Sequence, residues 1–192
     1  MVTERRTEKI KRILNFRQTD LTVVCENIHD PHNVSAILRS CDAVGVNTVH
    51  LLYTRESFPK LGKKSSASAK KWLDFKRHRN HQELQKCLKD QKMVIYATCI
   101  DASAKSIFEV DWTQPSAIIM GNEHRGVSSE ALAIADQMIF IPMFGMIESL
   151  NVSVATAVTL YEACRQRLLK RQYYQSKNPA WIEQILNRWI KQ

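Results

Sequence analysis

Four polar segments of the chain hold residue types that bind ligands or take part in chemistry. Each segment directly follows a short apolar run with the composition of a β-strand. In chain order they read NIHDPHNVSAILRS, CIDASAKS, NEHRGVSS and MFGMIESLN. Because parallel strands end at one edge of their sheet, and ligands collect at that edge, we expect the site to be built from these loops. Gly121, Gly126 and Gly145 lie in or beside two of them, where they serve either tight turns or a close approach of the backbone to a ligand.

Several well-known catalytic motifs are absent from the sequence. It contains no GxxxxGK[ST] motif and no GxGxxG after a strand, so phosphate-cradling hydrolysis and dinucleotide binding are disfavoured. Glu123 and His124 have no second histidine at the spacing of a metal motif and no thiolate pair nearby, so we expect no metal site. Ser149 and Ser153 do not lie on a nucleophile elbow, which argues against covalent catalysis by serine.

The elements that must position these loops alternate between strand-like apolar runs and helical stretches. This alternation is typical of a parallel sheet covered by helices, so the predicted fold class is α/β with a mostly parallel sheet. The predicted strands are residues 21–26, 46–53, 93–98, 117–121 and 138–142. The predicted helices between and after them are residues 33–44, 128–135 and 152 to about 173.

The apolar faces of these helices predict which side chains are buried. In the first helix Ala36, Ile37, Cys41 and Val44 form the apolar stripe, and Arg39 falls outside it. For the long helix, the residues that we expect to be buried are Val154, Val158, Tyr161, Cys164 and Leu168.

Two outer helices bracket the predicted core of about residues 20–165. The first, residues 3–16 within a basic N-terminal segment 1–17, is rich in Lys and Arg. The last, residues 179–190 of a segment 179–191, begins with proline and repeats Trp181, Ile185 and Trp189 at helical spacing. Such a stripe packs either in the core or on a second subunit. With no internal repeat and no linker, residues 1–192 are predicted to form a single domain.

The composition indicates a partner and a compartment. The chain has 28 Lys and Arg against 19 Asp and Glu, a net charge of +9. This excess is weak evidence for a polyanionic partner, and a solvated basic surface is the alternative. The five cysteines are widely spaced and odd in number, as in a protein of a reducing compartment. The N-terminus lacks the apolar region of a signal peptide, and no stretch is long enough to span a membrane. We expect a cytoplasmic protein that does not bind membranes.

Three motifs closely resemble the signatures of the SPOUT-class RNA ribose 2′-O-methyltransferases. They are HNVSAILRSCDAVGV from His32, IIMGNEHRGVS from Ile118 and IPMFGMIESLNVSVATAVTLYE from Ile141. The segments RQTDLTVV, SEALAIADQ, ACRQR and WIEQILNRWIK extend the resemblance over nearly the whole chain, and they are similar to the tRNA guanosine-18 2′-O-methyltransferase subgroup.

This resemblance implies several properties that spacing does not show. It implies an S-adenosylmethionine cofactor, a homodimer, and a deep trefoil knot in the C-terminal half whose loops form the cofactor pocket. It implies methyl transfer to the ribose 2′-OH of guanosine 18 in the tRNA D-loop. The alternatives are another tRNA position, ribosomal RNA, or a non-catalytic RNA-binding module on the same scaffold. The catalytic residues implied are Arg39, Asn33, Ser149 and Asn151. The cofactor-binding residues implied are Thr98, Gly121, Asn122, Glu123, Ile141, Met143, Ser149, Leu150 and Asn151.

Each implied role has a structural alternative. A sulfonium methyl is already electrophilic, so the protein must mainly align the ribose oxygen and help it to lose its proton. Because the free pKa of arginine is above about 12, Arg39 either is perturbed or orients the ribose and a phosphate; alternatively, it pairs with Asp42 or Glu26. Asn151 can cap the long helix and hold a ligand at the same time. Glu123 lies in the cofactor loop or at a dimer contact, or forms a surface ion pair with His124 or Arg125.

Basic residues are the candidates for RNA contacts. The run from Lys60 to Arg79 has eight Lys and Arg against the single acid Asp74, and its Ser and Ala content suggests a partly flexible loop. The residues assigned to RNA are Arg17, Lys63, Lys64, Lys70, Lys71, Arg77, Arg165 and Arg167. Any one of these charges could instead be a solvated surface group. Residues 55–68 depart most from the family pattern.

Overall fold

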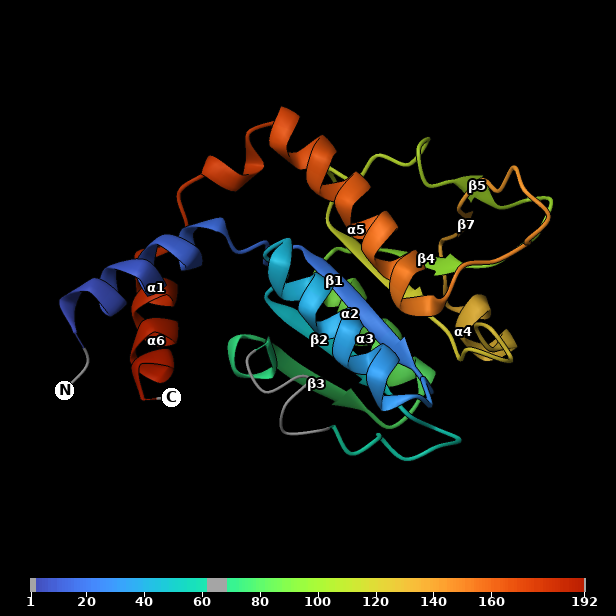
Figure 1. Cartoon of the computed structure of the whole chain (residues 1–192), viewed down its shortest axis with the longest axis horizontal. Coiled ribbons are helices and arrows are strands. Elements are labelled where there is room, and N and C mark those ends of the chain that lie inside the picture. Colours follow the sequence, from blue (N-terminus) through green and yellow to red (C-terminus); the bar gives the residue numbers. More distant parts are fainter. Residues whose placement is uncertain (1–2, 62–68, 192) are drawn as a thin grey trace.

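The structure, a computed structural model, describes residues 3–61 and 69–191 of the chain. Its centre is a seven-stranded sheet in the order β3-β2-β1-β6-β4-β7-β5, in which every pairing is parallel (Figure 1). The strands are β1 (Leu21–Glu26), β2 (Thr48–Leu52), β3 (Asp74–His78), β4 (Val94–Thr98), β5 (Lys105–Ser106), β6 (Ser116–Met120) and β7 (Gln137–Phe140). The predicted α/β class with a parallel sheet is confirmed.

Helices cover both faces of this sheet. The α-helices are α1 (Glu4–Phe16), α2 (Pro31–Ala43), α3 (His81–Asp90), α4 (Ser129–Ala133), α5 (Val152–Leu169) and α6 (Pro179–Ile190). Alternate side chains of the central strands point to opposite faces. Val23 and Ile118 pack in one core with α2 and α5, while Val24 and Ile119 pack in the other with α3 and α4. The inner strands are therefore buried on both sides, as parallel strands usually are.

The terminal helices α1 and α6 lie side by side at one end of the molecule (Figure 1). Thr3 caps α1, Asn178 caps α6, and Pro179 begins α6. Ile185 and Trp189 are buried against α1, and the Trp189 ring contacts Trp72 edge-on at 5.0 Å. The aromatic stripe of α6 therefore packs in a core of its own chain, which was one alternative; the other was packing on a second subunit.

Three elements were missed in the sequence. β3 is an edge strand of sequence DFKRH, whose charges hide its strand character, and α3 follows it behind an Asn80 cap. β5 has only two residues. Together with a short 3₁₀ turn at Ala69–Trp72, β3 occupies much of the basic run that we expected to be partly a flexible loop. The five predicted strands match β1, β2, β4, β6 and β7 to within two residues at each end.

The buried face of α5 differs from the prediction. Val154, Tyr161 and Leu168 are 46%, 57% and 44% exposed, so the expectation that they are buried was wrong. The face turned inward instead carries small and polar residues, among them Thr156 and Thr159. Their hydroxyls donate to the carbonyls of Val152 and Ala155, which satisfies them inside the helix and allows close packing on α2. Within residues 3–61 and 69–191, neither α5 nor any other helix has the length and apolar character to cross a membrane.

Candidate functional site

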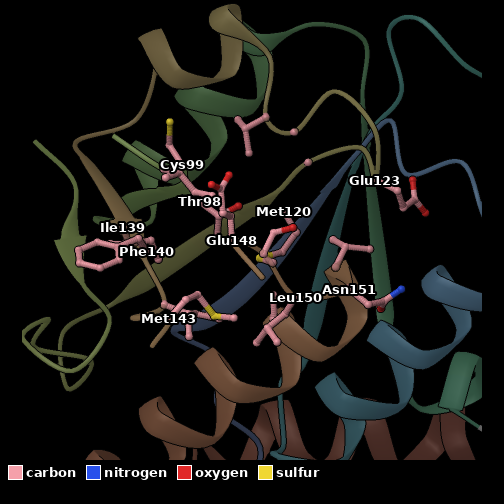
Figure 2. A pocket seen from close by; sticks show the side chains of 18 of the residues that line it. Thr98, Cys99, Met120, Glu123, Ile139, Phe140, Met143, Glu148, Leu150 and Asn151 are labelled. Atoms are coloured by element: carbon pink, nitrogen blue, oxygen red, sulfur yellow. The ribbon is translucent and has the colours of Figure 1, made fainter. Parts of the chain in front are cut away.

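A cavity of about 1030 Å³ lies at the carboxyl ends of β4, β6 and β7, next to the start of α5 (Figure 2). Its size is at the upper end of the range for small-molecule sites. In Figure 2, Glu123 and Asn151 lie on one side of the cavity and Cys99 and Phe140 on the other. All of the residues assigned to the cofactor line it: Thr98, Gly121, Asn122, Glu123, Ile141, Met143, Ser149, Leu150 and Asn151. Lining residues that were not assigned include Cys99, Met120 and Glu148.

The loop after β6 closes on itself beside the cavity. Asn122 and Gly126 exchange two backbone hydrogen bonds of 3.0 and 2.8 Å, and Gly126 has a φ of +68°. A Cβ on Gly121 would lie 2.2 Å from the backbone of Gly126 and Val127. Gly121 therefore serves a close approach, but the approach is of the loop's own backbone rather than of a ligand. The Asn122 amide donates to the carbonyl of Asn27 at 2.8 Å, which fixes the loop to the end of β1.

A chain of hydrogen bonds joins this loop to α2 and α5. The amide of Asn151 donates to Asn33 Oδ1 at 3.0 Å, and Asn33 Nδ2 donates to Glu123 Oε1 at 2.9 Å. Glu123 also accepts from the backbone N–H groups of His29 and Asp30 at 3.0 and 3.1 Å. Three residues that are far apart in the sequence therefore hold one another at the mouth of the cavity.

Glu123 is an ionised carboxylate in this network. Burial alone would raise its pKa, but the hydrogen bonds from Asn33, His29 and Asp30 outweigh burial and lower the pKa below its ordinary value. Its expected surface partners are not used, since Arg125 pairs with Glu56 instead. Glu123 thus connects the cavity loop to the start of α2.

The start of α5 presents polar groups to the cavity. Asn151 caps the helix by accepting from the Ser153 backbone N–H at 2.9 Å, and its amide reaches Asn33 as described above. Ser149 lies two residues earlier, exposed on the cavity wall. The first N–H groups of a helix have no partner within it and attract negative or polar atoms. This end of α5 can therefore both be capped and hold polar atoms of a ligand.

Arg39 extends from the exposed face of α2 and does not line the cavity of its own chain. It has no hydrogen-bond or ion-pair partner among residues 3–61 and 69–191. The ion pairs considered for it do not form, because Asp42 pairs with Arg17 and Glu26 is buried at the end of β1. The guanidinium is therefore not held by the described part of its own chain.

Glu26, to which no role was assigned from the sequence, connects the end of β1 to the residue that caps α4. Its side chain is buried and accepts from the Ser128 backbone N–H at 3.0 Å. His81 lies 3.7 Å from its other oxygen. A carboxylate ending the otherwise apolar strand LTVVCE was the signal available, since a buried acid is rarely retained without a partner.

The basic residues assigned to RNA fall into three groups. Lys70, Lys71, Arg77 and Arg165 are exposed. Arg77 lies over the Phe58 ring at 5.0 Å, and Arg165 pairs with Glu162 at 2.8 Å. The second group, Lys63 and Lys64, lies outside the described residues.

The third group, Arg17 and Arg167, requires a correction. Both guanidinium groups are buried, and both are held by partners inside the chain. Arg17 donates to the carbonyl of Val46 at 2.8 Å and to Asp42 at 2.5 Å. Arg167 donates to Asp20 Oδ1 at 2.6 Å and to the carbonyls of Trp112, Asp20 and Gln114. The expectation that they face RNA was wrong, because both guanidinium groups are buried and hydrogen-bonded to groups of their own chain.

The chain is similar in sequence to a known protein family and to a named enzyme. Residues 20–161 match the model of the SpoU rRNA Methylase family. The tRNA (guanosine(18)-2′-O)-methyltransferase of Thermus thermophilus is 45% identical over 190 residues, covering 98% of this chain and 97% of that protein.

Two solved structures extend the comparison. The A. aeolicus TrmH/SpoU tRNA modifying enzyme superimposes with a TM-score of 0.92 at 38% identity, covering 100% of this chain and 98% of the other. The SpoU methyltransferase AviRb from Streptomyces viridochromogenes, crystallised in complex with AdoMet, matches with a TM-score of 0.71 at 28% identity over 79% of this chain and 62% of the other.

Proposed function

The chain belongs to the SpoU family of RNA methyltransferases, and on that basis we propose that it methylates the ribose 2′-OH of guanosine 18 in the tRNA D-loop, using S-adenosylmethionine. The observation that carries the proposal is the gathering of all nine assigned cofactor residues around one cavity, with Asn33 hydrogen-bonded at its mouth. The 45% identical relative that carries this activity in its name supports the choice of substrate.

The cavity residues fit S-adenosylmethionine. Apolar side chains of Ile141, Met143 and Leu150 can pack on a flat adenine ring, while the capped start of α5 offers N–H groups to its polar atoms. Glu148 adds a carboxylate to the wall. Bound there, the cofactor supplies a methyl group on a positively charged sulfur, which is electrophilic without a metal.

The residues of the chain then have to align the attacking oxygen. Asn33 is fixed at both ends of its amide, by Glu123 and by Asn151, so its remaining hydrogen-bonding positions are oriented in advance. We assign Arg39 the task of holding the ribose and an adjacent phosphate through its planar, bidentate guanidinium. Ser149 and Asn151 hold the cofactor side of the site.

A homodimer is part of the same proposal. Arg39 lies outside the cavity of its own chain, and the neighbouring helix α5 exposes Val154, Tyr161 and Leu168 at seven-residue spacing on one face. A second copy packed on α2 and α5 would cover this stripe and bring an Arg39 to the cavity of the other copy. Exposed apolar side chains aligned in this way favour an interface over solvent.

The finer features that the family resemblance implies are proposed with it. These are a single catalytic domain with its core at about residues 20–165, a deep trefoil knot in the C-terminal half, and a cytoplasmic location. The cavity walls at residues 120–127 and 139–155 come from that half of the chain, which supports a pocket built by the loops of a knot.

Methyl incorporation tests the proposal. Unmodified tRNA transcript is incubated with tritiated S-adenosylmethionine and the modified nucleotide is mapped, for the wild type, Arg39→Ala and Arg39→Lys. We expect methylation at guanosine 18, a loss of at least about a hundredfold in Arg39→Ala, and only partial rescue by lysine, which keeps the charge but not the bidentate geometry. Methylation of another position or of ribosomal RNA would keep the chemistry and overturn the substrate. Cofactor binding without transfer to any RNA would favour the non-catalytic RNA-binding module.

A further inference from the structure

Three side chains of types that bind metals meet at the sheet edge, far from the cavity. They are His50 on β2, His78 on the edge strand β3 and Cys87 on α3. Each can present one ligand atom so that all three atoms lie within 4.8 Å of one another. His50 and His78 are buried, whereas Cys87 is partly exposed. The cluster is thus closed on the sheet side and open toward solvent at the helix.

The two imidazoles form a pair that satisfies only half of their polar atoms. His50 Nδ1 and His78 Nε2 lie 2.8 Å apart, and the rings are within 4° of parallel. The outer nitrogens, His50 Nε2 and His78 Nδ1, are buried and have no hydrogen-bond partner within the part of the chain that the structure describes. Because a neutral imidazole carries one proton, both inner nitrogens present lone pairs only when the outer nitrogens hold the protons.

The third side chain of the cluster, Cys87, has a polar neighbour of its own. The amide of Gln91 lies 3.5 Å from Cys87 Sγ and can donate to the sulfur, as outer partners of metal-bound thiolates do.

We propose that His50, His78 and Cys87 bind a zinc ion. Two imidazoles and one thiolate are a ligand set that zinc favours, and the exposed side of Cys87 leaves the fourth, tetrahedral position to water. With zinc–nitrogen bonds of about 2.0–2.1 Å, the two inner nitrogens would stand about 3.4 Å apart, so the pair has to open by roughly half an ångström. As the ion binds, the proton between the two rings moves to the outer nitrogen of its own ring, and the Cys87 thiol releases its proton to water.

Such an ion would fasten the outermost part of the sheet. It would tie the edge strand β3 to β2 and to α3, and β3 carries the exposed Lys76 and Arg77. The expectation of no metal site concerned Glu123, His124 and the spacing of the cysteines. The ligands of this cluster are separated by 28 and 9 residues and form no known motif. Only the parallel pairing of β2 with β3 and the packing of α3 bring them together.

Cobalt substitution tests the proposal without reference to methyl transfer. Metal-free, reduced protein is titrated with Co²⁺, and we expect tetrahedral d–d bands together with a near-ultraviolet thiolate-to-cobalt band that saturates at one ion per chain and disappears when Zn²⁺ is added. Zn²⁺ at a hundredfold excess over its Kd should raise Tm by about 5–10 °C. Absence of the thiolate band at saturating Co²⁺ would overturn the proposal.

Variants separate this site from adventitious binding. Cys87→Ser should abolish the thiolate band, and His78→Gln should weaken Zn²⁺ binding by at least about tenfold, with folding of each metal-free variant checked by circular dichroism. Cys164→Ser, another partly exposed cysteine on the opposite face of the sheet, is the matched control and should bind like the wild type. Persistence of the band in Cys87→Ser, or its loss in Cys164→Ser, would contradict the assignment.

Discussion

The sheet has one edge where its parallel strands begin and an opposite edge where they end. These two edges use the same kinds of polar residue in opposite ways. At the edge where β1, β2 and β6 begin, Arg167 and Arg17 are buried and hydrogen-bonded to carbonyls and carboxylates of their own chain. At the edge where the strands end, Asn33, Glu123 and Asn151 bind one another at the surface of a cavity. Arg39 lies further along α2 and has no partner among the described residues. Where the strands begin, the polar residues are satisfied inside the fold, and we call this the closed edge. Where the strands end, they border a cavity, and we call this the open edge.

This difference shows what residue type alone does not reveal. An arginine near a signature motif serves folding when carbonyls surround it and serves a ligand when nothing in the chain satisfies it. The measurable distinction is between stability and binding. Substitutions at the closed edge should reduce the free energy of unfolding, and substitutions at the open edge should mainly change ligand affinity or turnover.

The largest effect is expected at the closed edge, for Arg167→Met. Methionine fills most of the space but leaves the carbonyls of Trp112 and Gln114 and the carboxylate of Asp20 without their donor. Removing one member of such a buried network costs about 3–5 kcal/mol. Urea denaturation measures the free energy of unfolding. Arg165→Met on the same helix, whose side chain is 60% exposed, is the control and should lose less than about 1 kcal/mol. Equal losses would remove the distinction between buried and exposed arginines on this helix.

The exposed stripe of α5, which runs between the two edges, gives the next largest effect. Tyr161→Glu should raise the dissociation constant of the proposed homodimer by about a hundredfold, because a charge must be desolvated in an apolar contact. Sedimentation measures the dimer, and methyl transfer should fall at concentrations where it dissociates. Phe108→Glu, equally exposed in the loop after β5, is the control. A dimer unaffected by Tyr161→Glu, or activity that tracks monomer concentration, would place the interface elsewhere or make it unnecessary.

At the open edge, Glu123→Gln should show a smaller change that depends on pH. The hydrogen bonds from Asn33, His29 and Asp30 lower the folded-state pKa of Glu123 below its unfolded value of 4.5. Its contribution to stability is therefore complete above about pH 4.5 and is lost as the pH falls through the lower folded-state pKa. At pH 7 we expect a loss of about 1–2 kcal/mol, which shrinks toward zero on acidification.

Calorimetry adds a binding measurement to this prediction. Because Glu123 holds the cavity loop on α2, S-adenosylmethionine should bind about tenfold more weakly to Glu123→Gln. The matched control for stability is Glu148→Gln, an exposed carboxyl on the same cavity wall, which should change unfolding by less than about 0.5 kcal/mol. A stability difference between wild type and Glu123→Gln that stays constant from pH 7 to pH 3 would show that the network does not depend on the charge.

Some parts of the fold and of the site could be predicted from the sequence, and others could not. The apolar strands and the motif loops were predictable, because burial on both faces and polar loops at strand ends leave clear patterns. The edge strand β3 was not, since a half-exposed strand with Lys76 and Arg77 resembles a solvated loop. Nor was the burial of Arg17 and Arg167, because their partners at Val46 and Trp112 become neighbours only when the chain folds. Contacts between distant residues leave no local pattern.

The smallest expected effect concerns Lys70 and Lys71, which resemble neither edge because they are exposed and form no ion pair with the described residues. Lys70→Gln combined with Lys71→Gln removes two exposed cations from the middle of the basic run. If both contact phosphates, the apparent KM for tRNA should rise by about three- to tenfold, and the slope of log KM against log salt should fall by about one to two. S-adenosylmethionine affinity should not change. Lys86→Gln with Lys92→Gln, two exposed lysines in and after α3, is the control. If both double variants shift KM equally, the effect reflects net charge alone, whereas a shift confined to Lys70 and Lys71 places the phosphate backbone beside β3.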